Sequence, residues 1–266
     1  NGGVPSTVKP EFDSIDIIET ADGYRWKFMY EVQQADVLKY VTSDWIPVKY
    51  LTANDSTAQW DVQESAVDGA LDHIAVTAGG AGYYSCIGTA QAGSTSNTIK
   101  LDAATSSAVD DYYNNMTVYI TSGAGAGELK TITDYVGATR IATISTNWTN
   151  VPTDTSVFQV MPAVNVASST GSGADYRVSA VAAGAITKVT SVTRGTNYRD
   201  AIATVTSGAG SSCILKPMIS PTNGHGKDAV TELGGAKVML NTRLIGLDGS
   251  VFPINDDFRK VHLIVN

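Results

Sequence analysis

Two copies of one short pattern lie 115 residues apart in this 266-residue chain. Gly69-Ala70-Leu71 with Gly80 and Tyr83 aligns with Gly184-Ala185-Ile186 with Gly195 and Tyr198. Each copy is typical of a strand, a turn and a tyrosine, and the apolar residues Ile74 and Val189 also align. Because two copies are too few for a solenoid, the repeat predicts two similar hairpins that pack together.

Alternation of apolar and polar residues predicts β-strands near both ends of the chain. Tyr24–Val32 places its aromatic residues on one face and its charged residues on the other, as expected of a half-buried strand after an Asp22-Gly23 turn. Residues 238–244 alternate in the same way, and Phe258–Val265 predicts a last strand.

Two short helices are also predicted. Asp36 is expected to cap a helical turn that runs to Lys39. Asp228 is expected to cap a helix over Ala229–Leu233, which Gly234-Gly235 would end by supplying positive φ.

The middle of the chain differs in composition from its ends. Residues 58–220 are rich in Ala, Gly, Ser and Thr, with few charges, and the segment 89–161 has the spacing of short strands separated by tight turns. The predicted strands are Asn115–Ile120, Leu129–Ile132, Arg140–Ile144 and Ser156–Val160, with turns at Ser122–Gly127, Tyr135–Ala138 and Asn150–Asp154. This pattern favours a small sandwich or barrel.

The predicted fold class is therefore mainly β, with a discontinuous scaffold that carries an insertion. Residues 1–57 and 221–266 would form the β-rich scaffold domain with its short helices. Residues 58–220 would form an inserted all-β region of small sandwich or barrel units, with the nested module at 89–161.

Charge and hydropathy exclude several classes of protein. The net charge is −8 and no basic cluster occurs, which argues against nucleic-acid binding. No apolar run approaches the roughly 18–20 residues that cross a bilayer, and no signal peptide is visible. The two cysteines, Cys86 and Cys213, are predicted to be buried free thiols rather than a disulfide.

The sequence contains no local catalytic, metal or cofactor motif. The histidines at 73, 225 and 262 lack metal-ligand spacing, so surface or turn positions are expected. The glycine run 123–127 lacks the ending of a phosphate-binding loop and predicts a hairpin turn. The neighbouring carboxylates Asp110-Asp111 and Asp256-Asp257 are expected in turns or at strand starts. The aromatic residues Tyr83, Tyr84, Tyr112, Tyr113 and Trp148 are expected in hairpin cores, with sugar stacking as the alternative.

Three separated segments, together covering roughly 100 residues of both flanks, nevertheless resemble one protein family. They are residues 1–7 with 22–30, residues 42–48, and residues 224–235 closing with 257–261. In this order they resemble the gene-eight-type baseplate wedge protein of contractile-tailed, T-even-like bacteriophages, including their cyanophage relatives. The positions that carry the resemblance are Gly23, Tyr24, Trp26, Lys27, Trp45, Pro47, Gly224, His225, Gly226, Gly234, Gly235, Asp257, Phe258 and Arg259. Family members begin well upstream, so we expect the first part of the scaffold to be missing here.

The resemblance implies a structural virion component with no catalysed reaction and no cofactor. Such a protein would be made in the host cytoplasm and would lie in the tail baseplate, where it forms a homodimer in each wedge and joins other wedge proteins. The low-charge β surfaces fit this role, since charges are depleted at interface cores. We expect the isolated chain to be poorly soluble or heterogeneous. The alternatives are a receptor- or glycan-binding tail module, or a polysaccharide-degrading tail enzyme, which would need two carboxylates at a suitable separation.

Overall fold

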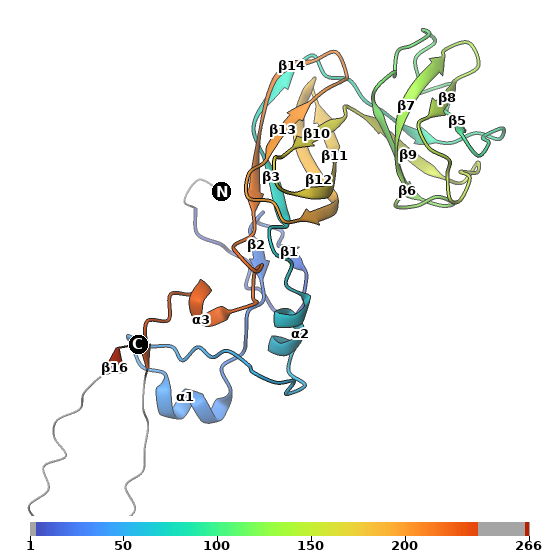
Figure 1. Ribbon diagram of the computed structural model, residues 1–266. Helices are drawn as coiled ribbons and strands as arrows, with labels where there is room; N and C mark the ends of the chain where they lie inside the picture. Colours follow the sequence, from blue (N-terminus) through green and yellow to red (C-terminus); the bar gives the residue numbers. More distant parts are fainter. Residues whose placement is uncertain (1–3, 239–263, 266) are drawn as a thin grey trace, which may run out of the picture. The chain divides into compact units, whose positions relative to one another are not determined.

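The computed structural model describes residues 4–238 and, for the backbone only, residues 264–265. Strands account for 39% of it and helices for 8%, so the chain is mainly β, as predicted. It divides into two compact units (Figure 1): a terminal unit of residues 1–67 with 221–266, and an insert unit of residues 68–220. The predicted boundary after residue 57 is too early, because helix α2 (Ala58–Ser65) belongs to the terminal unit.

The terminal unit contains short elements joined by irregular backbone. Its elements are β1 (Ile17–Glu19), β2 (Arg25–Lys27), α1 (Gln34–Tyr40), α2, α3 (Ala229–Glu232), β15 (Lys237–Val238) and β16 (Ile264–Val265). β1 pairs antiparallel with β2, and β15 with β16. No residue between 4 and 57 is buried, and the buried apolar residues described in this unit are Val62 and Ala229.

Two of the predicted elements in this unit differ from the structure. The strand expected over Tyr24–Val32 is reduced to the three residues of β2, because its partner β1 is only three residues long. Alternation predicts which face is buried, but a strand also needs a hydrogen-bonded neighbour. Helix α1 starts before Asp36, with Gln33 at its N-cap. Asp36 instead lies in the first turn, where its negative charge interacts favourably with the positive end of the helix dipole.

The C-terminal predictions fall mostly outside the described residues. β15 covers Lys237–Val238, and residues 239–244 of the predicted strand lie outside the described residues. The same holds for the strand predicted over Phe258–Val265, apart from β16.

Within the insert unit, one six-stranded antiparallel sheet forms what we call the sheet module, residues 86–161. Its strands are β4 (Cys86–Thr89), β5 (Thr98–Lys100), β6 (Thr117–Ser122), β7 (Leu129–Val136), β8 (Ile141–Ile144) and β9 (Val157–Met161). Their order is β4-β9-β6-β7-β8-β5, and the sheet curls around a core that includes Met116, Tyr135 and Phe158 (Figure 1). All four predicted strands are present within a few residues. β7 is longer than expected and runs to Val136.

The remaining residues of the insert unit, 68–85 and 162–220, form what we call the repeat body. Its strands are β3 (Leu71–Ala81), β10 (Val164–Ala167), β11 (Ser172–Ala182), β12 (Ala185–Thr196), β13 (Ile202–Val205) and β14 (Ser211–Ile219). Three antiparallel pairs form, β3 with β14, β11 with β12, and β10 with β13. As predicted, the two repeat strands β3 and β12 pack together, but only β12 pairs with its neighbour in sequence. β3 pairs with β14, about 140 residues away.

These pairs are related by an internal two-fold repeat. β12 lies 115 residues after β3, whereas β13 and β14 lie 39 residues after β10 and β11. The pairing register agrees with this repeat. For example, Val164 pairs with Val205, and Ala203, the equivalent of Val164, pairs with Val166, the equivalent of Val205. The two offsets differ by 76 residues, which is the length of the sheet module from Cys86 to Met161. The module is therefore an insertion in the first of two repeats.

Candidate functional site

The turn at Asp22-Gly23 anchors the start of the described chain. Gly23 has a φ of 79°, which brings the turn back on itself. The Asp22 carboxylate accepts hydrogen bonds from the Ser6 hydroxyl at 2.6 Å and from the Thr7 and Val8 backbone N–H groups at 2.8 and 3.1 Å. These donors stabilise the charged form and hold the pKa of Asp22 well below its usual range.

The family-motif positions after this turn differ in how they are held. The Tyr24 hydroxyl donates to the Val4 carbonyl, and Trp26 Nε1 donates to Thr20 Oγ1 at 3.2 Å. The Lys27 ammonium donates to the carbonyl of Ile15. Each contact ties β2, or the residue just before it, to an earlier part of the chain, which is a structural role.

The second and third motif segments contact each other although about 180 residues separate them. A Cβ on Gly235 would lie 3.2 Å from Val48 Cγ1. Two residues after the third segment, Lys237 Nζ lies 4.8 Å from the centroid of the Trp45 ring. Pro47, between Trp45 and Val48, is half-buried. A larger residue at 235 would push these segments apart.

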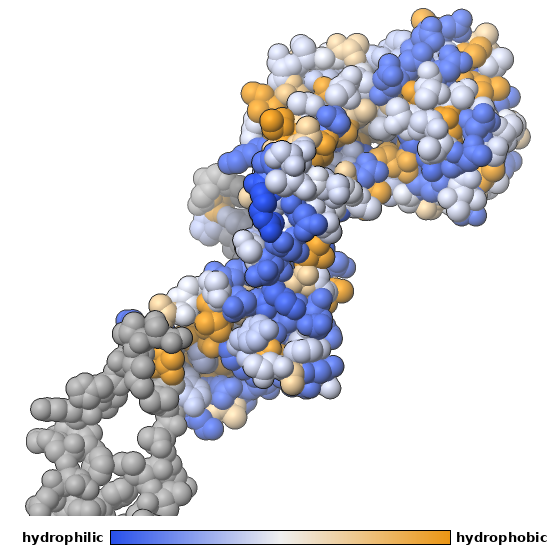
Figure 2. Space-filling view, viewed as in Figure 1, coloured by the Kyte–Doolittle hydropathy of each residue, from blue (hydrophilic) through white to orange (hydrophobic). Residues whose placement is uncertain are grey.

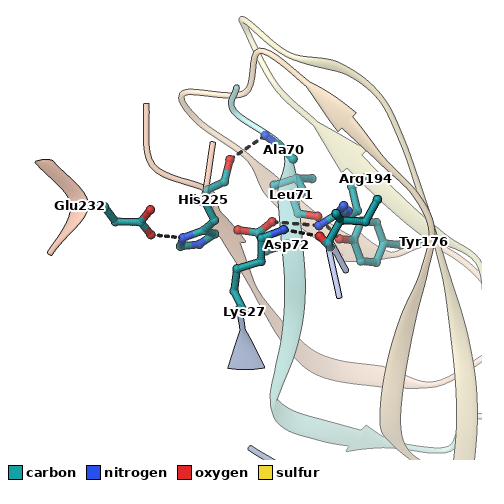
Figure 3. A network of polar contacts seen from close by, with 10 residues as sticks. Lys27, Ala70, Leu71, Asp72, Tyr176, Arg194, His225 and Glu232 are labelled. Carbon is teal, nitrogen blue, oxygen red and sulfur yellow. Dashed lines mark hydrogen bonds and ion pairs between the residues drawn. The ribbon is translucent and has the colours of Figure 1, made fainter. Parts of the chain in front are cut away.

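The Gly224-His225-Gly226 segment forms a tight turn against α2. Both glycines have positive φ, 89° and 84°, and a Cβ on Gly226 would lie 2.2 Å from Val62 Cγ1. His225 Nδ1 pairs with Glu232 Oε1 (Figure 3). The Gly226 N–H donates to Glu232 Oε2 at 2.9 Å. The expectation of a turn histidine is correct. Its carboxylate partner was not anticipated, because the pairing depends on the fold of the turn.

Helix α3 carries both terminal signals read from the sequence. The Asp228 carboxylate accepts from the Thr231 N–H at 3.1 Å, as an N-cap does. Gly234 has a φ of 71°, and the Gly235 N–H donates to the Val230 carbonyl at 2.7 Å. The prediction of a capped helix ended by this glycine pair is confirmed, with Leu233 at the C-cap.

Two buried glutamines on α2 hold the segment before the helix, and sequence reasoning missed them. Gln63 Oε1 accepts from the Leu51 N–H and its Nε2 donates to the Leu51 carbonyl, both at 3.0 Å. Gln59 Nε2 donates to the Lys49 carbonyl at 2.7 Å. A cavity of about 210 Å³ lies beside Gln59, lined by Asp13, Phe28, Glu31, Gln33, Lys49, Thr57, Ala58 and Gln59. Its charged lining consists of two carboxylates and one lysine, which together indicate no particular ligand.

The aromatic residues of the insert unit are mostly core residues, as predicted. Tyr83, Tyr113 and Trp148 are buried. Tyr112 is 37% exposed, its ring lies 4.4 Å from the half-buried ring of Tyr84, and the Tyr84 hydroxyl donates to the Tyr112 carbonyl at 2.7 Å. Only the pair of Tyr84 and Tyr112 therefore remains as a surface on which a sugar ring could stack.

A partly buried polar network stabilises the repeat body rather than forming a reactive centre. The Tyr176 hydroxyl on β11 donates to the Leu71 carbonyl on β3 at 2.5 Å, and Arg194 Nη1 lies 3.6 Å from Asp72 Oδ1 (Figure 3). Burial raises the pKa of the Tyr176 hydroxyl. The hydroxyl therefore stays protonated and serves as a hydrogen-bond donor.

The candidate acids and thiols do not converge. Asp110 accepts from the Gly137 N–H at 2.8 Å, and Asp111 from Asn114 Nδ2 at 2.7 Å, which are turn roles. Asp256, Asp257, Phe258, Arg259 and His262 lie outside the described residues. Cys86 and Cys213 are free thiols, as predicted, but only Cys86 is buried, whereas Cys213 is half-buried. Desolvation raises the pKa of both thiols. Within residues 4–238 no cluster of three or more His, Cys, Asp or Glu could hold a metal ion, and no helix there could span a membrane.

Exposed apolar side chains are the remaining surface feature. In the repeat body, Ile202, Ile214 and Met218 are 66%, 60% and 52% exposed, and Figure 2 shows apolar side chains gathered over the region of β14. In the terminal unit, Leu38, Ile46 and Leu233 are 82%, 70% and 56% exposed. Contiguous apolar patches mark surfaces that partners cover, whereas single exposed apolar residues are common on any protein.

Comparison of the chain with protein families, with curated proteins and with solved structures gave no match.

Proposed function

We propose that this protein is a non-catalytic structural component of a phage tail baseplate wedge, which joins neighbouring wedge proteins. The observation that carries the proposal is the contact between the second and third motif segments, where Gly235 meets Val48. Lys237, two residues after the third segment, lies over Trp45 of the second. Segments that resemble one family in order along the chain are also neighbours in one folded unit. This is what a shared scaffold fold would produce.

The packing of the terminal unit supports a role in assembly. Its described residues bury only two apolar side chains completely, Val62 and Ala229, while Leu38 and Ile46 are largely exposed. Burial of apolar area is the main favourable contribution to folding, at roughly 25 cal/mol per Å². A unit with so little of it gains stability from neighbouring proteins, in the wedge from a second copy and from other wedge components.

The behaviour of the purified full chain tests this proposal. We expect concentration-dependent association in sedimentation velocity experiments, because association would bury the exposed side chains of Leu38 and Ile46. The double variant Leu38→Glu, Ile46→Glu should lose that association, whereas Val109→Glu, which changes an exposed residue of the sheet module, should keep it. A monodisperse monomer that melts cooperatively would contradict the proposal, as would a cryo-EM map of the tail in which this chain has no place in the wedge.

A receptor- or glycan-binding tail module is the second candidate. The observation that favours it is the partly exposed pair of rings at Tyr84 and Tyr112, since aromatic faces stack on sugars. The test is glycan-array binding by the full chain. Binding that Tyr112→Ala abolishes and Tyr50→Ala leaves unchanged would favour this candidate, because Tyr50 is an exposed tyrosine of the terminal unit. No binding would exclude it for the glycans on the array.

A further inference from the structure

The sheet module and the repeat body have separate hydrophobic cores. Tyr83 and Met161 lie in the core of the repeat body, whereas Tyr84 packs against the core of the module and Val160 lies within it. The chain thus passes from one core to the other between consecutive residues, once on the way out and once on the way back. Next to these crossings, Cys86 pairs with Val160 in the ladder of β4 and β9. The connection is a two-stranded ribbon.

Arg177, on the outward face of β11, joins the repeat body to the module beside this ribbon. Its guanidinium carbon lies 3.9 Å from the centroid of the Tyr119 ring on β6. Its Nη1 donates to Gln159 Oε1 on β9 at 2.7 Å. A cation over an aromatic face and a hydrogen bond from a charged donor are both strongly directional contacts. Together they favour one orientation of the module.

The internal repeat supplies a natural comparison. Lys216 on β14 is the equivalent of Arg177, 39 residues later, and the residues on either side of it, Leu215 and Pro217, face inward like Tyr176 and Val178. Lys216 is exposed and has no module over it. The fold of the repeat therefore does not need a cation that is covered at this position. The contacts of Arg177 serve the inserted module.

We propose that Arg177 is a positioning residue that holds the sheet module in one orientation on the repeat body, and that the module turns about the ribbon when this contact is lost. The ribbon alone restrains the module weakly, because only two chain segments cross between the cores. This inference does not depend on the role in a baseplate. It concerns how the insert unit presents the surface of its module.

Residual dipolar couplings of the full-length protein test the proposal, because they report whether two bodies share one alignment tensor. In the wild-type protein a single tensor should fit amides of both module and repeat body. Arg177→Ala should lose this common tensor, with smaller couplings for the module. Lys216→Ala, the matched control, should keep it, and Arg177→Lys should restore it in part, because lysine keeps the charge without the planar hydrogen-bonding group.

Unchanged amide shifts in the two cores will show that each variant is folded. If Arg177→Ala disturbs folding, the double variant Tyr119→Leu, Gln159→Ala removes both contacts from the side of the module and should give the same loss. The proposal is overturned if Arg177→Ala keeps the common tensor, if Lys216→Ala has the same effect as Arg177→Ala, or if the wild-type protein already needs two tensors.

Discussion

The backbone N–H of Tyr83 donates to the Gly184 carbonyl, and the N–H of the equivalent Tyr198 donates to the Gly69 carbonyl, both at 2.9 Å. Each tyrosine is thus hydrogen-bonded to the glycine at the start of the other repeat. The glycines that meet the rings are equivalent as well. A Cβ on Gly210 would lie 2.3 Å from Tyr83 Cγ, and a Cβ on Gly171 would lie 2.3 Å from Tyr198 Cγ.

This reciprocity predicts that Gly171→Ala and Gly210→Ala destabilise the repeat body to a similar degree. Each added methyl group would clash with a tyrosine ring that is already buried, and overpacking of this kind costs about 3 kcal/mol. Gly127→Ala is the control, because it has positive φ but nothing within 4 Å of its Cβ, so only backbone strain of about 1 kcal/mol is expected. Urea unfolding followed by near-UV circular dichroism measures all three. Equal effects of the three substitutions would show that ring packing is not the cause.

Loss of the Tyr176 hydroxyl should destabilise the protein more than loss of the Tyr84 hydroxyl. Tyr176→Phe leaves the buried Leu71 carbonyl without its donor, which costs about 1–2 kcal/mol. In Tyr84→Phe, water can replace the donor to the more exposed Tyr112 carbonyl, so the expected change is within about 0.5 kcal/mol. Thermal melting of the two variants checks the difference, and a larger shift for Tyr84→Phe would contradict it.

The Asp22 contacts predict a dependence on pH in the terminal unit. Because the pKa of this carboxyl is lowered in the folded protein, its stabilising effect is present above the ordinary pKa of 3.8 and is lost as the pH falls below that value. At neutral pH, Asp22→Asn should therefore reduce hydrogen-exchange protection of the Thr7 and Val8 amides. The difference between wild type and variant should shrink as the solution is acidified.

Asp13→Asn is the matched control for this experiment, since it removes one negative charge from an exposed carboxylate of the same unit. It should leave the two amides unchanged. A difference between wild type and Asp22→Asn that grows on acidification would show that the sign of the argument is wrong.

The sheet module should be removable without loss of the repeat body. In the second repeat, residues 199–201 connect Tyr198 to β13, at the place where the first repeat carries the module. A chain in which Arg-Asp-Ala replaces residues 84–162 should keep the fold of the repeat body, because Met161 is the one module residue in its core and the other core residues remain. Amide chemical shifts of β11, β12 and β14 would show this. Collapse of those shifts to unfolded values would mean that the module is part of the folding unit.

Local signals in the sequence predicted local structure well. Asp228 and Gly234 predicted both ends of α3, and the glycine run 123–127 predicted the turn between β6 and β7. The 115-residue repeat predicted that β3 and β12 lie together. In each case the physical cause acts within a few residues, or acts identically in both copies.

Pairing over long distances was not predictable in the same way. The partner of β3 is β14 rather than a neighbour in sequence, and the Glu232 that holds His225 was not anticipated. The strand expected over Tyr24–Val32 ends at Lys27, because β1 offers no further partner. Alternation and composition show what a segment can bury, but not which distant segment will cover it.

The sequence by itself determined the β class, the turns, the helix caps and the existence of two equivalent repeats, since these follow from backbone preferences and side-chain periodicity. Only the tertiary structure decided that the strands of the repeats pair across the two copies and that the module is an insertion in the first. It also decided that Arg177, unlike its equivalent Lys216, contacts the module. Those choices depend on burial and hydrogen bonding between residues far apart in the chain, which no local pattern specifies.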